Sequence, residues 1–177
     1  MDLVEKAIIF AREKHKNQFR KGTPIPYIVH PIDVMQILRE NDADETTITA
    51  GLLHDTIEDA GVTYDEICKE FGKEIADIVK DESEDKSKPY KIRKQEQMKK
   101  LKYCSTKSKM VTCADKLSNI KSAYLDLKYY GEHTWDKFNG TKDDLDWYYH
   151  LVLDTLASIK ETNMYKQLEY YVKEIFD

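Results

Sequence analysis

The stretch Gly51–Gly61 reads GLLHDTIEDAG and puts one imidazole and three carboxylates among small and apolar residues. The polar members are three or four positions apart, the spacing that shares one face of an α-helix: His54, Asp55, Glu58 and Asp59. Three apolar neighbours would anchor such a helix to a core: Leu52, Leu53 and Ile57. Acids at the border of a buried face are costly when they are left unpaired, and a divalent cation neutralises them. The stretch therefore favours a metal site on a helix over a solvated helix face.

Helical spacing of apolar residues continues on both sides of this stretch. It predicts helices at roughly 4–11, 31–38, 48–60, 63–71, 75–79, 91–103, 105–120, 141–159 and 168–175. Capping-box signatures open two of them, Thr63 with Glu66 and Thr141 with Asp144. The polar segment Asp81–Tyr90 and the segment 129–140 are expected to be loops. No segment alternates with a period of two, so we expect an all-α single domain, residues 1–177, of roughly eight to ten helices.

Composition narrows the classes of function. The chain has 177 residues, of which 41% are hydrophobic and 34% charged, and a net charge of -5. This charge argues against nucleic acid polymers as partners, but it allows a small anionic substrate where positive charge is concentrated locally. No apolar run approaches the roughly 20 residues of a membrane span, and the amino terminus has no signal segment. We therefore expect a cytoplasmic protein that does not bind membranes; a homo-oligomer is compatible with the sequence.

Two residues of one stretch cannot complete a metal site, so further ligands must come from elsewhere in the chain. The sequence offers His30, in PYIVHPID, and Asp115, in TCADKLSNIK, and each lies next to a helical apolar pattern. Together with His54 and Asp55 they make a set of two imidazoles and two carboxylates. Such a mixed set suits manganese, iron or zinc with positions left for water and substrate, and we expect Mn²⁺ or another divalent cation.

Three motifs carry a resemblance to a known family: RKGTPIPYIVHP at 20–31, LLHDTIED at 52–59 and ADKLSNIKS at 114–122. Their H…HD…D pattern resembles the HD-domain phosphohydrolase superfamily. The fuller set looks like the hydrolase domain of the RelA/SpoT family, and most like the stand-alone small alarmone hydrolases. The resemblance implies removal of pyrophosphate from the 3′ position of guanosine tetra- or pentaphosphate (ppGpp or pppGpp), with a bound manganese ion. The sequence has no second segment for a synthetase domain, so we expect a protein that only degrades the alarmone.

The same resemblance assigns roles to individual residues. It implies that the metal ligands are His30, His54, Asp55 and Asp115. Glu58 and Asp59 match the acidic pair that orients and deprotonates the attacking water. It also implies four substrate contacts: Arg20, Lys21, Asn119 and Ser122, the last at a position where the family often has threonine. Tyr27 is a weaker candidate for the pocket wall.

Chemistry supports these roles independently of the resemblance. A bound metal can lower the pKa of water from 15.7 to about 7, and a carboxylate such as Glu58 can act as general base. Arg20 offers a planar donor fork for phosphate or a face for stacking on a base, and Lys21 a compact positive charge. Two alternatives stay open: a metal-dependent phosphohydrolase acting on another nucleotide or on a phosphorylated dinucleotide such as NADPH, and a non-catalytic nucleotide sensor. The acidic pair counts against the sensor, which has no need of water activation.

Overall fold

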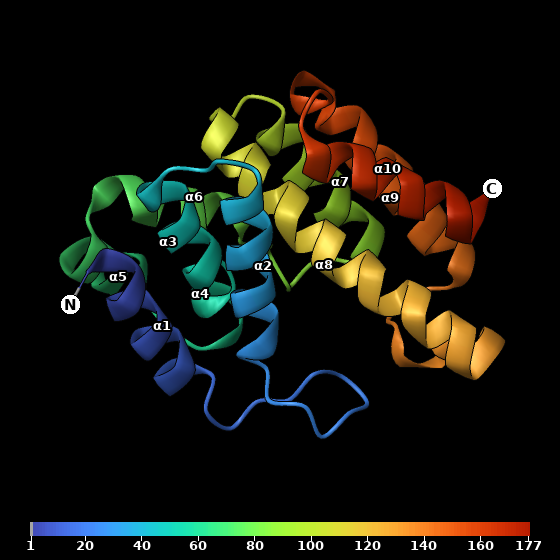
Figure 1. The fold of residues 1–177 in the computed structure, drawn as a ribbon, viewed down its shortest axis with the longest axis horizontal. Coiled ribbons are helices and arrows are strands. Elements are labelled where there is room, and N and C mark those ends of the chain that lie inside the picture. The colour runs from blue at the N-terminus through green and yellow to red at the C-terminus, as the bar shows by residue number, and fades with distance from the viewer. Residues whose placement is uncertain (1) are drawn as a thin grey trace.

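Helices make up the regular structure of residues 2–177, the part of the chain that the computed structural model describes (Figure 1). The α-helices are α1 (Leu3–Lys14), α2 (Val29–Glu40), α3 (Glu45–Leu53), α4 (Thr56–Asp59), α5 (Tyr64–Phe71), α6 (Lys73–Glu82), α7 (Tyr90–Leu101), α8 (Thr106–Tyr130), α9 (Lys142–Thr155) and α10 (Asn163–Phe176). Two 3₁₀ helices join them: η1 (Gly131–Lys137) and η2 (Ala157–Ile159). Within this range the only strand-like pairing is an isolated bridge between Phe19 and Pro26. The all-α prediction is confirmed.

Side-chain caps set where several helices begin. Thr141 and Asp144 form the predicted capping box at the start of α9, because each side chain accepts a hydrogen bond from the other residue's backbone N–H. At α5 only half of the predicted box forms: Thr63 accepts from the backbone N–H of Glu66. Each bond satisfies an N–H that the first turn of a helix leaves without a backbone partner.

The core forms where α2, α3 and α6 pack against the long helix α8. In Figure 1, α2 and α3 lie side by side, and α8 runs past them to the far end of the molecule, where α10 packs against it and α9 packs against α10. Four fully buried side chains of α8 face this core: Val111, Ala114, Leu117 and Ile120. Since α2, α3 and α8 are mutual neighbours, polar residues at the ends of their buried faces can meet. No helix in residues 2–177 is both long and apolar enough to cross a membrane.

The structure corrects the predicted helix through Gly51–Gly61. Helix α3 ends at Leu53, His54 and Asp55 form a turn, and the single turn α4 follows. The backbone N–H of Asp59 still donates to the carbonyl of Asp55, so α4 restarts at once. His54 and Asp55 therefore lie in the turn between α3 and α4, where the side chains of both can reach toward α8.

The two expected loops are shorter than predicted. Helix α6 extends to Glu82 and α7 begins at Tyr90, which leaves residues 83–89 between them. In segment 129–140, α8 continues to Tyr130 and η1 follows directly. Lys137, the last residue of η1, bonds to Asp126 of α8, which holds this segment against the helix.

Candidate metal centre and adjoining pocket

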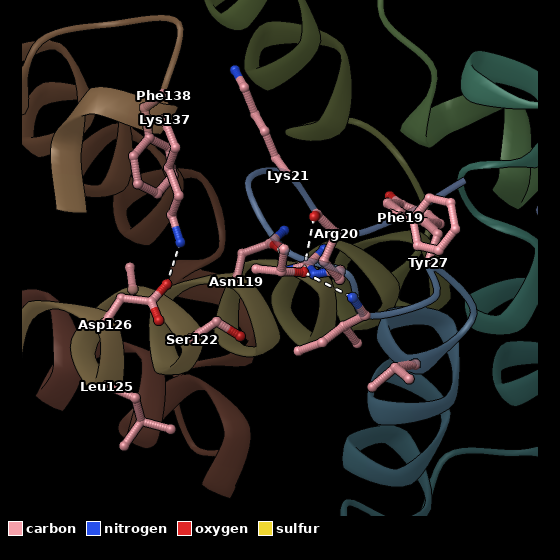
Figure 2. A pocket seen from close by; sticks show the side chains of 14 residues that line it. Phe19, Arg20, Lys21, Tyr27, Asn119, Ser122, Leu125, Asp126, Lys137 and Phe138 are labelled. Carbon is pink, nitrogen blue, oxygen red and sulfur yellow. Dashed lines mark hydrogen bonds and ion pairs between the residues drawn. The ribbon is translucent and has the colours of Figure 1, made fainter. Parts of the chain in front are cut away.

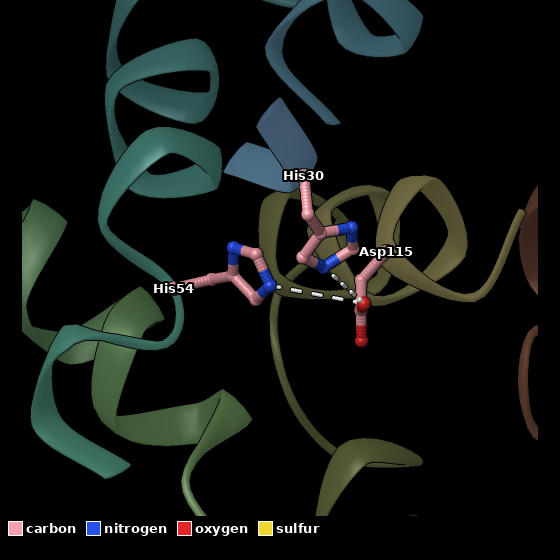
Figure 3. Close-up of side chains that lie close together, drawn as sticks. All are labelled: His30, His54 and Asp115. Atoms are coloured by element: carbon pink, nitrogen blue, oxygen red, sulfur yellow. Dashed lines mark ion pairs between the residues drawn. The ribbon is translucent and has the colours of Figure 1, made fainter. Parts of the chain in front are cut away.

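Three parts of the chain bring the histidines and acids of the motifs together. His30 lies in the first turn of α2, His54 and Asp55 in the turn after α3, and Asp115 in the first half of α8. Figure 3 shows the imidazoles of His30 and His54 and the carboxylate of Asp115 turned toward one another. The ligand atoms of these three residues all lie within 4.8 Å of one another.

The carboxylate of Asp55 also approaches the two imidazoles. Its Oδ2 lies 2.9 Å from Nε2 of His54 and 3.8 Å from Nε2 of His30. The Oδ1 of Asp115 lies 3.0 Å from Nε2 of His30 and 3.7 Å from Nε2 of His54. Each carboxylate therefore approaches both imidazoles, although Asp55 does not belong to the closest mutual group. The structure thus brings all four sequence-predicted ligand residues into one cluster.

The ring nitrogens that face away from the cluster are already engaged. Nδ1 of His54 donates to the carbonyl of Gly51 at 2.7 Å, because a carbonyl can only accept. Nδ1 of His30 lies 3.0 Å from the Ser118 hydroxyl. Such partners fix the orientation of the rings and leave Nε2 as the donor atom for a metal. Nε2 of His54 is buried and makes no well-directed hydrogen bond within residues 2–177, although Oδ2 of Asp55 lies 2.9 Å away, so the donor set fits a divalent cation.

Burial and charge act against each other in this cluster. Burial would lower the pKa of His54, but the Asp55 and Asp115 carboxylates outweigh it and raise that pKa well above its usual value. For His30 burial prevails and lowers the pKa. Burial would raise the pKa of Asp55, but the neighbouring His54 outweighs burial and lowers this pKa below its usual value. The two carboxylates therefore favour positive charge between them, which a divalent cation would supply.

Further polar side chains hold the two carboxylates. The Tyr27 hydroxyl donates to Oδ2 of Asp55 at 2.5 Å. Asp115 accepts from Nζ of Lys116 at 2.5 Å and from Nδ2 of Asn119 at 2.6 Å. Lys116 itself lies over the ring of Tyr148. These contacts fix the orientation of the two carboxylates, as hydrogen-bond partners of metal ligands commonly do.

The residues of the cluster line a small cavity of about 120 Å³. Glu58 lines it, and its Oε2 accepts from the backbone N–H of Glu84 at 3.1 Å. Burial raises the pKa of Glu58 above its usual value. Asp59 lies outside the cavity wall, but Lys86 contacts both acids and lies 3.3 Å from Oε1 of Glu58. Residues 83–89 are therefore tied to the acidic pair.

Glu82 is a buried acid that the sequence analysis does not single out. It lines the same cavity and accepts a hydrogen bond from the Thr112 hydroxyl at 2.6 Å. Burial raises its pKa to about 7. In the sequence Glu82 is one of four acids at the start of the polar segment Asp81–Tyr90, and only the packing of α6 against α8 distinguishes it from the others.

A larger pocket of about 400 Å³ adjoins the small cavity, and Tyr27 and Asn119 line both. Arg20 and Lys21 line it from the segment before α2, and Ser122 lines it from α8; Nζ of Lys21 donates to Oδ1 of Asn139 at 2.7 Å. Figure 2 shows Arg20 beside Asn119, whose Oδ1 accepts from Nη2 of Arg20 at 2.9 Å. All four predicted substrate contacts thus lie around one pocket, next to the metal cluster. With Lys137 the pocket has three cations against the single acid Asp126, in a protein whose net charge is -5.

Comparisons with known proteins show the family to which the chain belongs. A family model described as "HD domain" matches residues 7–129. A Xenopus tropicalis protein named guanosine-3′,5′-bis(diphosphate) 3′-pyrophosphohydrolase MESH1 is 41% identical over 138 residues, which cover 76% of this chain and 75% of that protein. The Homo sapiens protein of the same name is 34% identical over 172 residues, covering 94% and 89%. A solved structure described as a metazoan ortholog of SpoT that hydrolyzes ppGpp superposes with a TM-score of 0.81 at 27% identity, over 98% of this chain and 96% of the other.

Proposed function

Since the chain belongs to the HD-domain family, we propose that it is a metal-dependent hydrolase that converts guanosine 3′,5′-bis(diphosphate), or the corresponding pentaphosphate, to GDP or GTP and pyrophosphate. Relatives that share three quarters or more of its length are named for this reaction. The observation that carries the proposal is the adjacency of the His–Asp cluster and the cationic pocket, which share Tyr27 and Asn119. A phosphate on the 3′ side can then reach the cluster while the nucleoside occupies the pocket. We assign the reaction to one domain that spans residues 1–177.

His30, His54, Asp55 and Asp115 are the proposed ligands of the cation, with Mn²⁺ as the expected metal. When bound, a divalent cation supplies Lewis acidity, which lowers the pKa of water and polarises phosphoryl oxygens. The protein's contribution is to fix the ligands: Gly51 and Ser118 hold the imidazoles, as described above, and Tyr27 holds Asp55.

Glu58 is the proposed general base. It lines the small cavity next to the cluster, and its raised pKa brings the carboxylate closer to the pH at which a base works efficiently. Asp59 shares the Lys86 ammonium with Glu58 and reaches solvent, so we assign to it the relay of the proton out of the site. The hydrogen bond from the backbone N–H of Glu84 and the Lys86 ammonium both oppose the effect of burial on the pKa of Glu58.

The substrate contacts are assigned to the larger pocket. Arg20 and Lys21 supply positive charge for phosphate groups, and the planar guanidinium of Arg20 also offers a stacking face. Asn119 is bonded to both Arg20 and Asp115, so it couples the nucleotide side of the site to the metal side. Ser122 adds a hydroxyl one turn further along α8.

The test is an assay of Mn²⁺-loaded protein against guanosine tetraphosphate, guanosine pentaphosphate, NADPH and other phosphorylated nucleotides, with identification of the products. The proposal expects intact pyrophosphate and GDP or GTP. Release of orthophosphate from a different compound would assign the protein to another phosphohydrolase activity. Binding of guanosine tetraphosphate without turnover would make it a sensor and overturn the proposal.

A further inference from the structure

One face of α8 connects the small cavity with the far end of the larger pocket. At 3.6 residues per turn, four polar residues of α8 fall within about 60° of one another around the helix: Asp115, Asn119, Ser122 and Asp126. The first two line the small cavity, and the last three line the larger pocket. A ligand that lies along this face therefore runs from the metal cluster to Asp126, three helical turns and about 16 Å of helix away.

The far end of this path holds a pair of opposite charges. Asp126 Oδ2 accepts from Nζ of Lys137, the last residue of η1, and Figure 2 shows the two side chains meeting at the pocket edge. Both are partly exposed, at 29% and 28% of the side chain. No other ion pair or side-chain hydrogen bond to the Asp126 carboxylate occurs within residues 2–177. The second carboxylate oxygen is therefore available to a ligand.

The surroundings of this pair suit a purine base better than a phosphate. Apolar side chains line the pocket on both sides of a flat ring's path: Leu125 and Phe138 on the side of this pair, and Phe19 at the other end beside Tyr27 (Figure 2). The Asp126 carboxylate would repel a phosphate group, whereas Arg20 and Lys21 provide positive charge elsewhere in the pocket. The carboxylate therefore requires a ligand part that donates hydrogen bonds.

We infer that Asp126 and Lys137 recognise the edge of the guanine base and make the protein selective for guanosine nucleotides. Guanine presents two donors, N1–H and the 2-amino group, beside one acceptor, O6. Oδ1 of Asp126 can accept from the 2-amino group. Oδ2 can accept from N1–H with its second lone pair, beside its bond to Lys137, and the ammonium of Lys137 can donate to O6. Adenine offers one donor and an acceptor nitrogen on this edge, so it matches the pair less well. This inference rests on the proposed function, to which it adds the residues that select the base.

The test compares substrates that differ only in the base: the 3′,5′-bis(diphosphates) of guanosine, inosine and xanthosine, each assayed with the Mn²⁺-loaded full chain. Inosine lacks the 2-amino group, and xanthosine has an oxygen in its place. The wild type should lose roughly ten- to a hundredfold in kcat/KM from guanosine to inosine, the size of one hydrogen bond to a charged group. The loss should lie in KM, because the base is remote from the reacting phosphate.

The variant Asp126→Asn tests the base recognition more directly than wild-type kinetics do. Its amide has one acceptor and one donor in place of two acceptors. The amide can accept from N1–H and donate to the 2-oxygen of xanthine, so this variant should prefer xanthosine over guanosine, opposite to the wild type. Lys137→Met should lower kcat/KM on guanosine and inosine alike, since both carry O6. Asp146→Asn, at a partly exposed acid paired with His150 on α9, is the matched control and should keep the wild-type order.

The outcomes separate the two claims. If the wild type hydrolyses none of the three compounds, the proposed function fails. If it hydrolyses guanosine and inosine substrates equally well and Asp126→Asn leaves the order of bases unchanged, recognition by Asp126 and Lys137 is wrong while the hydrolase remains.

Discussion

At the scale of single residues, the atom that each ligand side chain can offer to a cation depends on the hydrogen bonds that its other polar atoms make. His54 can offer Nε2 because Nδ1–H donates its hydrogen bond to the Gly51 carbonyl. Asp115 can offer Oδ1 in a fixed direction because Lys116 and Asn119 hold the carboxylate. Glu58 accepts one hydrogen bond, from a backbone N–H, and lies near Lys86. Its carboxylate is therefore held less firmly than that of Asp115, as suits a general base rather than a metal ligand.

Replacing Glu58 by glutamine should separate catalysis from metal binding. The variant keeps the shape of the side chain but cannot take a proton, so kcat should fall by roughly a hundred- to ten-thousandfold. Metal content, measured by atomic emission, should stay at the wild-type level. Glu66→Gln, at an acid paired with Lys14 outside the site, should leave kcat unchanged. Full activity of Glu58→Gln would remove this residue from the mechanism.

Glu82 should make the metal-free protein less stable as the pH rises. Its folded pKa of about 7 lies above the ordinary value of 4.5, so the folded state favours the protonated form. That stability is fully present below pH 4.5 and is lost as the pH rises through about 7; the full effect is about 3 kcal/mol. Glu82→Gln, which cannot ionise, should therefore gain stability relative to the wild type from pH 4.5 to 8 in urea unfolding. An equal pH dependence of the two proteins would show that Glu82 is not responsible.

At the scale of elements, the close approach of α2 and α3 sets the position of the His54 turn. A Cβ at Gly51 would lie 2.4 Å from Cδ1 of Leu38 and 3.3 Å from Cγ1 of Val34, both fully buried on α2. Glycine at this position therefore lets the two helices pack closely, and it places the carbonyl that holds His54.

Gly51→Ala should destabilise the protein by about 1–3 kcal/mol, the usual effect of overpacking a core. Urea unfolding of Gly51→Ala, Leu38→Ala and the double variant measures it. Because the new methyl group occupies space that Leu38 vacates, the double variant should be more stable than the sum of the single effects predicts. Additive effects would contradict the close approach.

The elements also show how far the sequence could predict the structure. Apolar spacing predicted the helical core, and the three motifs predicted which residues meet. The break at His54 and Asp55 could not be predicted, because the apolar pattern continues through Ile57 and no glycine or proline marks the turn. Glu82 and the Asp126–Lys137 pair were missed for a different reason. Their neighbours are far away in the sequence, so only the packing of α6 and η1 against α8 reveals them.

At the scale of the whole molecule, the proposed cation links distant segments and should stabilise the fold. Its ligands come from α2, the turn after α3, and α8, so the unfolded chain cannot present them together. Mn²⁺ at 100 times its Kd should add about 2.7 kcal/mol to the free energy of unfolding. A chelator should remove this increment, and Asp55→Ala should lack both the increment and the activity. A wild-type unfolding curve that Mn²⁺ does not shift would contradict binding at these ligands.

The most direct test of the account is anomalous diffraction from crystals of the protein grown with Mn²⁺. We expect one strong peak bounded by Nε2 of His30, Nε2 of His54 and carboxylate oxygens of Asp55 and Asp115. A well-ordered site at these four residues without such a peak, or a peak bound elsewhere in the chain, would contradict it.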